Sequence, residues 1–271
     1  MKTFLKGNIM SCLYETCLSD CAWEVIEPLF PANAKRGRRR VYSFRSIVDA
    51  IFYVLKNGCV WRCLPNEFPP HGIVYHYFRT WSVSGLWAVL NCILVAIVRT
   101  CAGRDASPSL VSIDSQSQTA EPGVDERGLD GGKKINGRKR HIVVDTMGLM
   151  LLCICTAANV SDRVAGEELV TELNKREKFP RLAKILGDNA YKNLSSDLRV
   201  GVSTETAERL KGQKGFVPQI FRWAVERTFA WLNRNRRLVR NYEKNTKHQE
   251  SMNYIANARL CIRRLENWLT T

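Results

Sequence analysis

Three carboxylate side chains that lie far apart in the sequence could together support metal-dependent chemistry. Asp188 follows Asp114 by 74 positions, and Glu226 follows Asp188 by 38. Three carboxylates held within a few ångströms repel one another, and a hard divalent cation such as Mg²⁺ or Mn²⁺ relieves this repulsion because it prefers oxygen ligands. Two such ions, about 3.5–4 Å apart, can activate a water molecule or a 3′-hydroxyl group and stabilise the leaving oxygen of a phosphodiester.

Each of these carboxylates also has an ordinary structural explanation when it is considered alone. Asp114 and Asp188 could be turn residues at the ends of strands. Glu226 could pair with Arg222 or Arg227 along a helix. For any single carboxylate the ordinary explanation is favoured, so the metal chemistry depends on the three lying together.

The elements that must position these carboxylates follow an α/β pattern. Strand patterns cover residues 110–114, 141–145, 149–157 and 182–186, with a possible fifth strand at 198–202, and helix patterns cover 162–177 and 219–236. Asp114 and Asp188 close the first and fourth strands, and the ends of neighbouring strands in an α/β sheet commonly carry reactive groups. Asp145 precedes the hairpin turn at Met147 and Asp162 begins a helix, so both have sufficient structural roles.

The first hundred residues predict a separate helical region. Helix patterns cover residues 20–26, 44–55, 73–81 and 86–98. Ser43 is a predicted N-cap, and Gly58 a predicted C-terminal stop. A linker at 102–108 predicts two domains, residues 1–101 and residues 108–271. Several short helices beside a basic loop favour a helix-turn-helix-like DNA-binding domain; a helical bundle that only packs on the rest is the alternative.

The chain is strongly basic for its length. Its 271 residues include 41 Lys and Arg against 26 Asp and Glu, a formal net charge of +15. Such a surface attracts polyanions through counterion release, so nucleic acid is the leading partner. An acidic membrane surface is a weaker alternative because no long basic amphipathic helix stands out. Residues 86–98 are too few to span a bilayer and predict a buried helix.

The ten cysteines are scattered and predict reduced thiols rather than disulfides. Residues 1–13 lack the apolar core of a signal peptide, so we expect a cytoplasmic protein. The pairs Cys17/Cys21 and Cys59/Cys63 could suit a metal, but no matching pair follows at zinc-site spacing. Small hydrophobic thiols are the favoured interpretation.

Two basic segments are candidates for DNA contact. The first precedes the second predicted strand and contains Lys133, Lys134, Arg138, Lys139, Arg140 and His141. The second surrounds the last predicted helix and contains Arg222, Arg227, Arg234 and Arg237. Phosphate contact and a simple solvated loop are equally common explanations of the first segment. Trp223 and Trp231 could stack on bases, although packing is favoured for both.

The motifs taken together resemble those of the bacterial DDE transposases of the insertion-sequence-five type, within the insertion-sequence-four superfamily. The glutamate region of that family resembles residues 222–232, followed by 236–238 and 242–243. Its aspartate motifs resemble residues 112–117 and 186–191, and a basic motif resembles 130–145. Its helical DNA-binding region resembles residues 58–65 and 74–78. The similarity covers nearly the whole chain in the expected order, which makes the joint signal specific.

The resemblance implies a fold, a site and a reaction. The fold is α/β, with a ribonuclease-H-like catalytic core and a helix-turn-helix-like N-terminal domain. The catalytic and metal-binding triad is Asp114, Asp188 and Glu226, holding two Mg²⁺ or Mn²⁺ ions. The protein would bind terminal inverted repeats, cleave DNA to a free 3′-hydroxyl group and join it to target DNA. The expected partners are double-stranded DNA, both transposon ends and target DNA, and at least one more copy of the chain in the synaptic complex. The expected location is the bacterial cytoplasm, at the nucleoid, and no membrane partner is expected.

The sequence departs from the family at several positions. A related tyrosine-arginine-glutamate-lysine pattern would place Tyr at 219 and Lys at 233, where this chain has Gln219 and Asn233. Arg234 is a neighbouring candidate for the lysine. Asn189 and Ala190 replace the glycine pair expected after the second aspartate. The triad itself is intact.

Two other functions fit parts of the same pattern. One is a catalytically inactive, transposase-derived DNA-binding protein or repressor, which the intact triad argues against. The other is a host repair or processing nuclease, which shares the metal chemistry but needs neither end-specific binding nor strand joining.

Overall fold

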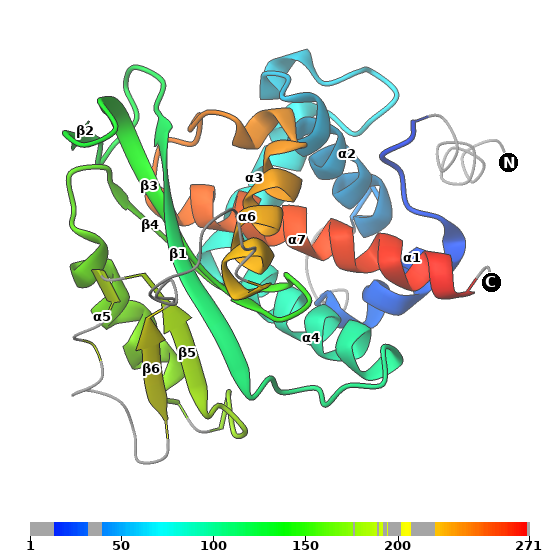
Figure 1. Cartoon of the computed structure of the whole chain (residues 1–271). Coiled ribbons are helices and arrows are strands. Elements are labelled where there is room, and N and C mark those ends of the chain that lie inside the picture. The colour runs from blue at the N-terminus through cyan, green and yellow to red at the C-terminus, as the bar shows by residue number, and fades with distance from the viewer. Residues whose placement is uncertain are drawn as a thin grey trace, which may run out of the picture.

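The structure is a computed structural model, and it describes residues 14–31, 40–175, 177–188, 190–191, 194, 202–206 and 220–269, without the side chains of 206, 220–222 and 269. A curled mixed sheet lies on one side and a group of helices on the other (Figure 1). The helices are α1 (Asp20–Ile26), α2 (Phe44–Asn57), α3 (His71–Val83), α4 (Leu86–Cys101), α5 (Asp162–Leu173), α6 (Ile220–Asn233) and α7 (Thr246–Leu269). The strands are β1 (Leu110–Thr119), β2 (Gly128–Asp130), β3 (Ile135–Asp145), β4 (Met150–Ala157), β5 (Lys184–Gly187) and β6 (Ser203–Thr206). Short 3₁₀ helices are η2 (Glu27–Leu29), η3 (Trp61–Cys63) and η5 (Arg236–Leu238).

The described strands form one sheet in the order β2-β3-β1-β5-β6, and β4 pairs with β3. The β1–β3, β2–β3 and β3–β4 pairs are antiparallel. The β1–β5 and β5–β6 pairs are parallel. β1 is therefore the strand at which the antiparallel half of the sheet meets the parallel half.

The predicted N-terminal helices are confirmed, and their ends have clear chemical causes. The hydroxyl of Ser19 accepts a hydrogen bond from the Ala22 amide at the start of α1. The hydroxyl of Ser43 accepts from the Ser46 amide at the start of α2. Gly58 ends α2 in the left-handed conformation, with φ of 70°, which glycine adopts without steric cost.

Both long strands extend beyond the ranges predicted from the sequence. β1 continues past Asp114 to Thr119, because β3 supplies hydrogen-bonding partners along its length from Val111 to Thr119. The expectation that Asp114 closes its strand is therefore wrong. β3 begins at Ile135 rather than at His141, so most of the basic segment expected to be a loop belongs to a strand.

Other C-terminal elements agree with the sequence only in part. The predicted hairpin is confirmed, with Gly148 at its turn at φ of 72°. α5 ends at Leu173, earlier than expected. The possible strand at 198–202 lies almost entirely outside the described residues, and β6 begins at Ser203.

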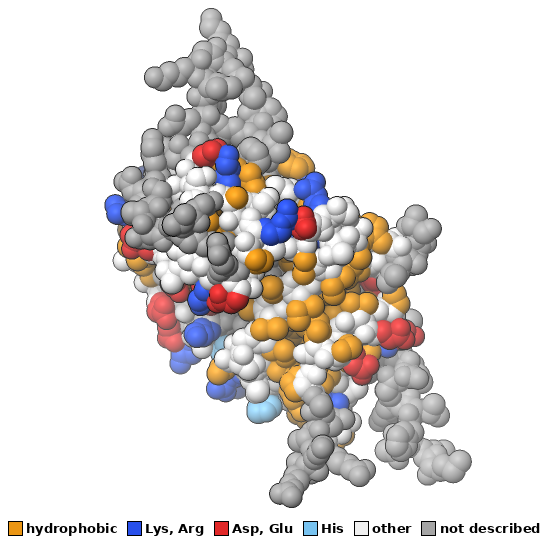
Figure 2. Space-filling model, turned by 90° about the horizontal axis from the view of Figure 1, so that it is seen from below, with side chains coloured by type: hydrophobic (Ala, Val, Ile, Leu, Met, Phe, Trp, Pro, Cys, Tyr) orange, Lys and Arg blue, Asp and Glu red, His pale blue; other side chains and the backbone are white. Residues whose placement is uncertain are grey.

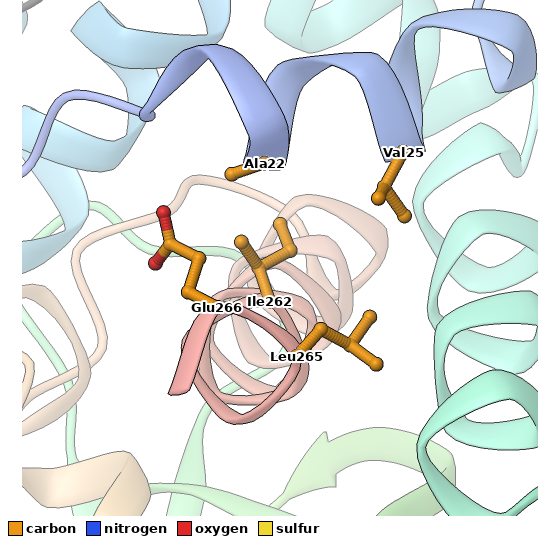
Figure 3. Close-up of a pocket in the computed structure, with 5 residues that line it drawn as sticks. All are labelled: Ala22, Val25, Ile262, Leu265 and Glu266. Carbon is orange, nitrogen blue, oxygen red and sulfur yellow. The ribbon is translucent and has the colours of Figure 1, made fainter. Parts of the chain in front are cut away.

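α7 is the largest element that the sequence did not predict, since the helix at 219–236 was expected to be the last. It has 24 residues and packs against α4, β4 and the other N-terminal helices, so it runs between the sheet and the helical group (Figure 1). Near its end, α1 crosses it and leaves a shallow gap lined by Ala22, Val25, Ile262, Leu265 and Glu266 (Figure 3).

α4 is apolar on both its inner and its outer side. Trp87 and Leu94 face the core, while Val89 on the outer side is 56% exposed. The face of the molecule on which α4 lies carries a band of hydrophobic side chains (Figure 2). No single helix among the described residues is both long and apolar enough to cross a membrane, although the α3–α4 pair, bent by 74°, meets the same length and composition criteria when its helices are joined.

Candidate active site

Asp114 lies on β1, and Asp188 directly follows β5, the strand that pairs with β1 in parallel. Ser112 on β1 pairs with Leu186 on β5, and each aspartate lies two residues beyond its member of this pair. Side chains two residues apart on a strand share a face, and paired strands lie about 4.8 Å apart. Asp188 is exposed and caps the turn that follows β5, since its Oδ1 accepts from the Ala190 amide at 3.0 Å.

The hydroxyl of Tyr191 lies within electrostatic range of both aspartates. Burial raises the pKa of Tyr191, and the negative charges of Asp162, Asp114 and Asp188 raise it further. The Tyr191 ring lies on the opposite face of the sheet, where it packs against Gly166 of α5. Each of the two candidate aspartates therefore lies near Tyr191, and their joint role in one site stays a prediction.

α6 covers the face of β1 that carries Asp114. Gln118, four residues beyond Asp114 on the same face, donates from Nε2 to the carbonyl of Leu238 just after α6. The hydroxyl of Thr228, nearer the start of α6, donates to the carbonyl of Gly148 at 2.7 Å. Gly148 lies in the turn between β3 and β4, beside the start of β1. These two contacts show that α6 runs in the same sense as β1.

Glu226 is exposed on the first half of α6, one turn before Phe229. Phe229 is buried, and the guanidinium of Arg140 lies 5.3 Å from its ring centre. Residues three apart on a helix share a side, so Glu226 lies on the side of α6 that faces β1 and β3. Glu226 thus lies on the helix that covers the face of β1 carrying Asp114, and its membership of a triad stays a prediction.

Metal binding by these carboxylates depends on their donor atoms and on their spacing. The oxygen donors suit Mg²⁺ or Mn²⁺. Within the described part of the chain, however, no group of three or more His, Cys, Asp or Glu side chains lies close enough to hold a metal ion. The donor chemistry therefore fits while the spacing of the described side chains does not, and the triad stays a prediction.

Two arginines of the first basic segment are buried in β3. Arg138 is fully buried and donates to the backbone carbonyls of Asp125, Glu243 and Lys244. Arg140 is 1% exposed and is bound to side chains of three other elements. Their guanidinium groups hold the fold together here, and their contact with DNA remains a prediction.

Lys139 and His141 lie on the other face of β3, beside α5. The ammonium of Lys139 donates to Asp162 at 2.9 Å and to the carbonyl of Val160 at 2.9 Å. His141 is fully buried, with Nε2 3.0 Å from the Thr156 hydroxyl. Burial lowers the pKa of His141 to about 4, although Asp162 acts to raise it. The imidazole is therefore neutral near pH 7, so it brings no charge to the basic segment.

Lys133 and Lys134 are the two members of this segment that are exposed, in the turn between β2 and β3. The carboxylate of Asp130 shapes the turn by accepting from the amides of Gly132 and Lys133, both at 3.1 Å. Lys134 has a positive φ of 55°. This turn presents two unburied ammonium groups and is the part of the segment best suited to a phosphate backbone.

The arginines around α6 divide into stacked, exposed and buried ones. Arg227 lies between two indoles, with its guanidinium carbon 3.9 Å from the ring centre of Trp223 and 4.7 Å from that of Trp231. Arg234 is exposed and Arg237 is 7% exposed. The side chain of Arg222 lies outside the described residues, as do Gln219, Asn189 and the basic run at 35–39.

One further acid and one amide have structural roles. Asp145 is fully buried, pairs with Arg99 and accepts from the amides of Met147 and Leu149, which agrees with its predicted role at the hairpin turn. Asn233, where the family pattern would place lysine, accepts from Arg140 at 2.7 Å. The sequence had no signal for that contact, because the two residues are far apart in the chain.

Comparison with known proteins gives the family. Residues 18–91 match the family model described as "Putative transposase of IS4/5 family", and residues 105–215 and 197–263 match two models described as "Transposase DDE domain". An "Insertion element IS402 uncharacterized 16.2 kDa protein" of Burkholderia cepacia is 33% identical over 106 residues, which are 37% of this chain and 71% of that relative. This chain belongs to the IS4/5 family of DDE transposases.

A second relative carries the transposase description itself. The "Putative transposase for insertion sequence element IS402" of the same organism is 31% identical over 121 residues, which are 40% of this chain and 54% of that relative. The matched segment therefore spans about half of that relative's length. No solved structure matches the chain. Membership of this insertion-sequence transposase family makes DNA the expected partner of the chain.

Proposed function

We propose that this transposase binds the terminal inverted repeats of an insertion sequence, cleaves DNA at those ends to a free 3′-hydroxyl group and joins that end to target DNA. The observation that supports the proposal is the parallel pairing of β1 with β5, in which Ser112 and Leu186 are partners and each lies two residues before a candidate aspartate, Asp114 or Asp188. Phosphodiester chemistry needs a group of ligands that can hold cations at the reacting phosphate, and the chain offers carboxylates in the order that the family pattern requires.

In this proposal Asp114, Asp188 and Glu226 hold two Mg²⁺ or Mn²⁺ ions in a ribonuclease-H-like core. The ions would activate the attacking oxygen and stabilise the leaving one. The chain itself orients the ligands: β1 and β5 fix the aspartates, while α6 carries the glutamate. The carboxylates must come closer together than in the described structure, and phosphate oxygens between them would complete the ligand set.

The basic residues would hold DNA around these carboxylates. Lys133 and Lys134 are the first candidates because they are exposed, and Arg222, Arg227 and Arg234 would act along α6. We propose residues 1–101 as the DNA-binding domain and 108–271 as the catalytic domain. Paired ends require at least two copies of the chain in a synaptic complex, which would act at the nucleoid in the bacterial cytoplasm.

The test is a cleavage and joining assay. Wild-type protein would meet double-stranded DNA carrying the flanking ends, with Mg²⁺ or Mn²⁺, beside Asp188→Asn and the matched control Glu167→Gln. Glu167 is an exposed carboxylate on α5, on the far side of the sheet. We expect wild type and Glu167→Gln to nick and join the ends, and Asp188→Asn to lose at least about 10³-fold in rate, since it removes a metal ligand.

The alternatives predict different products. Tight end binding without cleavage by the wild-type protein would identify an inactive, transposase-derived DNA-binding protein. Metal-dependent cleavage without end preference or joining would identify a repair or processing nuclease.

A further inference from the structure

Three segments that are far apart in the sequence meet in the structure: η3, α3 and the start of α7. The indole of Trp61 on η3 lies 5.3 Å from the ring of Tyr75 and 5.1 Å from that of Phe78, both on α3, between ring centres. The Phe78 ring lies 5.5 Å from the imidazole of His248, in the first turn of α7. These rings form one packed group, so the exposed side chains that flank it lie on a common surface.

Each of the three segments presents exposed cations beside this aromatic group. They are Arg62 on η3, Arg79 on α3, Lys244 just before α7 and Lys247 at its start. Burial lowers the pKa of His248, and the charge of Arg79 lowers it further, which places Arg79 within electrostatic range of α7. These four cations form the η3–α3–α7 patch.

The patch is not neutralised by acids of its own segments. Among η3, α3 and residues 242–248 the one acid is Glu243, which is 3% exposed and already ion-paired. The exposed acids at residues 125–126 lie at the edge of the patch, where the Asp125 amide donates to the Lys244 carbonyl at 2.8 Å. A surface of this charge attracts a polyanion.

We propose that the η3–α3–α7 patch is a docking surface for the phosphate backbone of double-stranded DNA, and that residues 242–248 complete it. The inference rests on the proposed function, because the patch would hold the DNA ends that are to be cleaved. It differs from a DNA-binding domain confined to residues 1–101, since two of the four cations come from beyond α6. Cations on a fixed surface set the position and orientation of a duplex through its phosphates.

The backbone of the C-terminal half of the patch is fastened to the sheet. The amide of Asn241 donates to the Thr119 carbonyl at the end of β1, and its carbonyl accepts from the Glu121 amide, both at 2.9 Å. Arg138 of β3 donates to the carbonyl of Lys244 at 2.7 Å. DNA on the patch would therefore lie at a fixed position relative to β1, whereas a domain joined only by a linker could move.

Two double variants of the full-length protein divide the patch by its origin in the chain. Arg62→Ala/Arg79→Ala removes the cations of the N-terminal helices, and Lys244→Ala/Lys247→Ala removes those beside the sheet. All four side chains are exposed, so the thermal midpoints should stay near the wild-type value. Each variant lowers the net charge of the chain by two.

A third double variant controls for the loss of charge itself. Lys175→Ala/Lys178→Ala removes two exposed lysines that pair with Glu172 near the end of α5. Binding is measured by fluorescence anisotropy with a labelled duplex that carries the flanking ends, without divalent metal and at several salt concentrations. We expect each patch variant to reduce the slope of log affinity against log salt by about 2, since each phosphate contact contributes about 0.9, and the control to keep the wild-type slope.

The outcomes separate this inference from the proposed function. If Lys244→Ala/Lys247→Ala behaves like the control while Arg62→Ala/Arg79→Ala lowers the slope, DNA docks on the N-terminal helices alone and the inference is wrong. Wild-type slopes for both patch variants would also overturn it, without affecting the proposed chemistry. A wild-type protein that binds the ends through both halves of the patch but neither cleaves nor joins them would support the patch and overturn the proposed reaction.

Discussion

Arg237 and Glu243 form a buried ion pair at the point where the segment after α6 meets the N-terminal helices. Arg237 donates from Nε to the Glu243 Oε1 at 2.8 Å, and its Nη2 lies 2.7 Å from the same oxygen. Its Nη1 donates to the carbonyl of Cys59 at 3.3 Å. The arginine that the sequence offered as a DNA contact thus joins η5 to the loop after α2.

Removing one member of this pair should strongly destabilise the protein. Arg237→Ala would leave Glu243, which is 3% exposed, as an uncompensated buried charge. We expect the free energy of unfolding to fall by about 3–5 kcal/mol, measured by urea denaturation. The double variant Arg237→Met/Glu243→Leu should recover much of this loss. A loss below about 1 kcal/mol for Arg237→Ala would show that the pair contributes little.

The N-terminal helices could be predicted because their signals are local. Ser19 and Ser43 each begin a helix with a side chain that caps it, and Gly58 ends one. Apolar side chains then recur at three- and four-residue steps over a buried face. Signals of this kind depend only on neighbours in the sequence.

α7 was not predicted although buried apolar side chains, including Met252 and Ile255, recur along it, because polar side chains are buried beside them. Gln249, Asn253 and Asn257 are each at most 1% exposed. The amide of Asn257 donates to Asn91 on α4 at 2.6 Å, and its oxygen accepts from the Met150 amide. These partners are distant in sequence, so the burial of the three amides in the core could not be read from the chain.

The candidate site shows the same division between local and distant information. The motifs around Asp114, Asp188 and Glu226 could be read directly from the sequence. The burial of Arg138 and Arg140 could not, because a basic run is usually solvated and their acceptors lie far along the chain. The triad can therefore be proposed from the sequence, but which of the basic residues are buried could not be predicted from it.

The stability of the protein should depend on pH through Glu250. This carboxylate lies at the buried side of α7, where its Oε1 accepts from the Cys155 amide at 2.9 Å, and burial raises the pKa of Glu250 to about 7. Because the pKa of Glu250 is higher in the folded state than its unfolded value of about 4.3, protonated Glu250 stabilises the fold. This contribution is complete below pH 4 and is lost as the pH rises through about 7.

Glu250→Gln should remove this dependence. The glutamine oxygen can accept the same hydrogen bond without carrying a charge, so the variant should be more stable than wild type at pH 8 by about 2 kcal/mol. At pH 4 the two proteins should be nearly equal. Urea denaturation across this range measures both, and a variant less stable than wild type at pH 8 would contradict the assignment.

Lys133 and Lys134 should contribute to DNA binding through charge alone. Replacing both with alanine should weaken binding to every DNA sequence and reduce the slope of log affinity against log salt by about 2, since each phosphate contact contributes about 0.9. Titrations at several salt concentrations measure this slope. Lys178→Ala, a change at an exposed lysine beside Glu172, is the control, and an equal effect there would mean that no local contact exists at the turn.

A methyl group added at Gly187 should disturb the placement of Asp188. A Cβ at this position would lie 2.9 Å from Cγ2 of Ile113 and 3.0 Å from Cβ of Tyr191, and both neighbours are buried. Because neither can move freely, the strand end that carries Asp188 must shift. We expect Gly187→Ala to cost about 1–3 kcal/mol of stability and to reduce DNA cleavage strongly.

The comparison of binding with cleavage makes the Gly187 prediction specific. DNA-end affinity should remain near the wild-type value, because the exposed basic residues are distant from the added methyl group in sequence and belong to other elements. Gly72→Ala is the matched control, since a Cβ at Gly72 on α3 would have nothing within 4 Å and alanine favours a helix. Full cleavage by Gly187→Ala would show that the position of Asp188 tolerates movement, and would weaken its proposed role as a metal ligand.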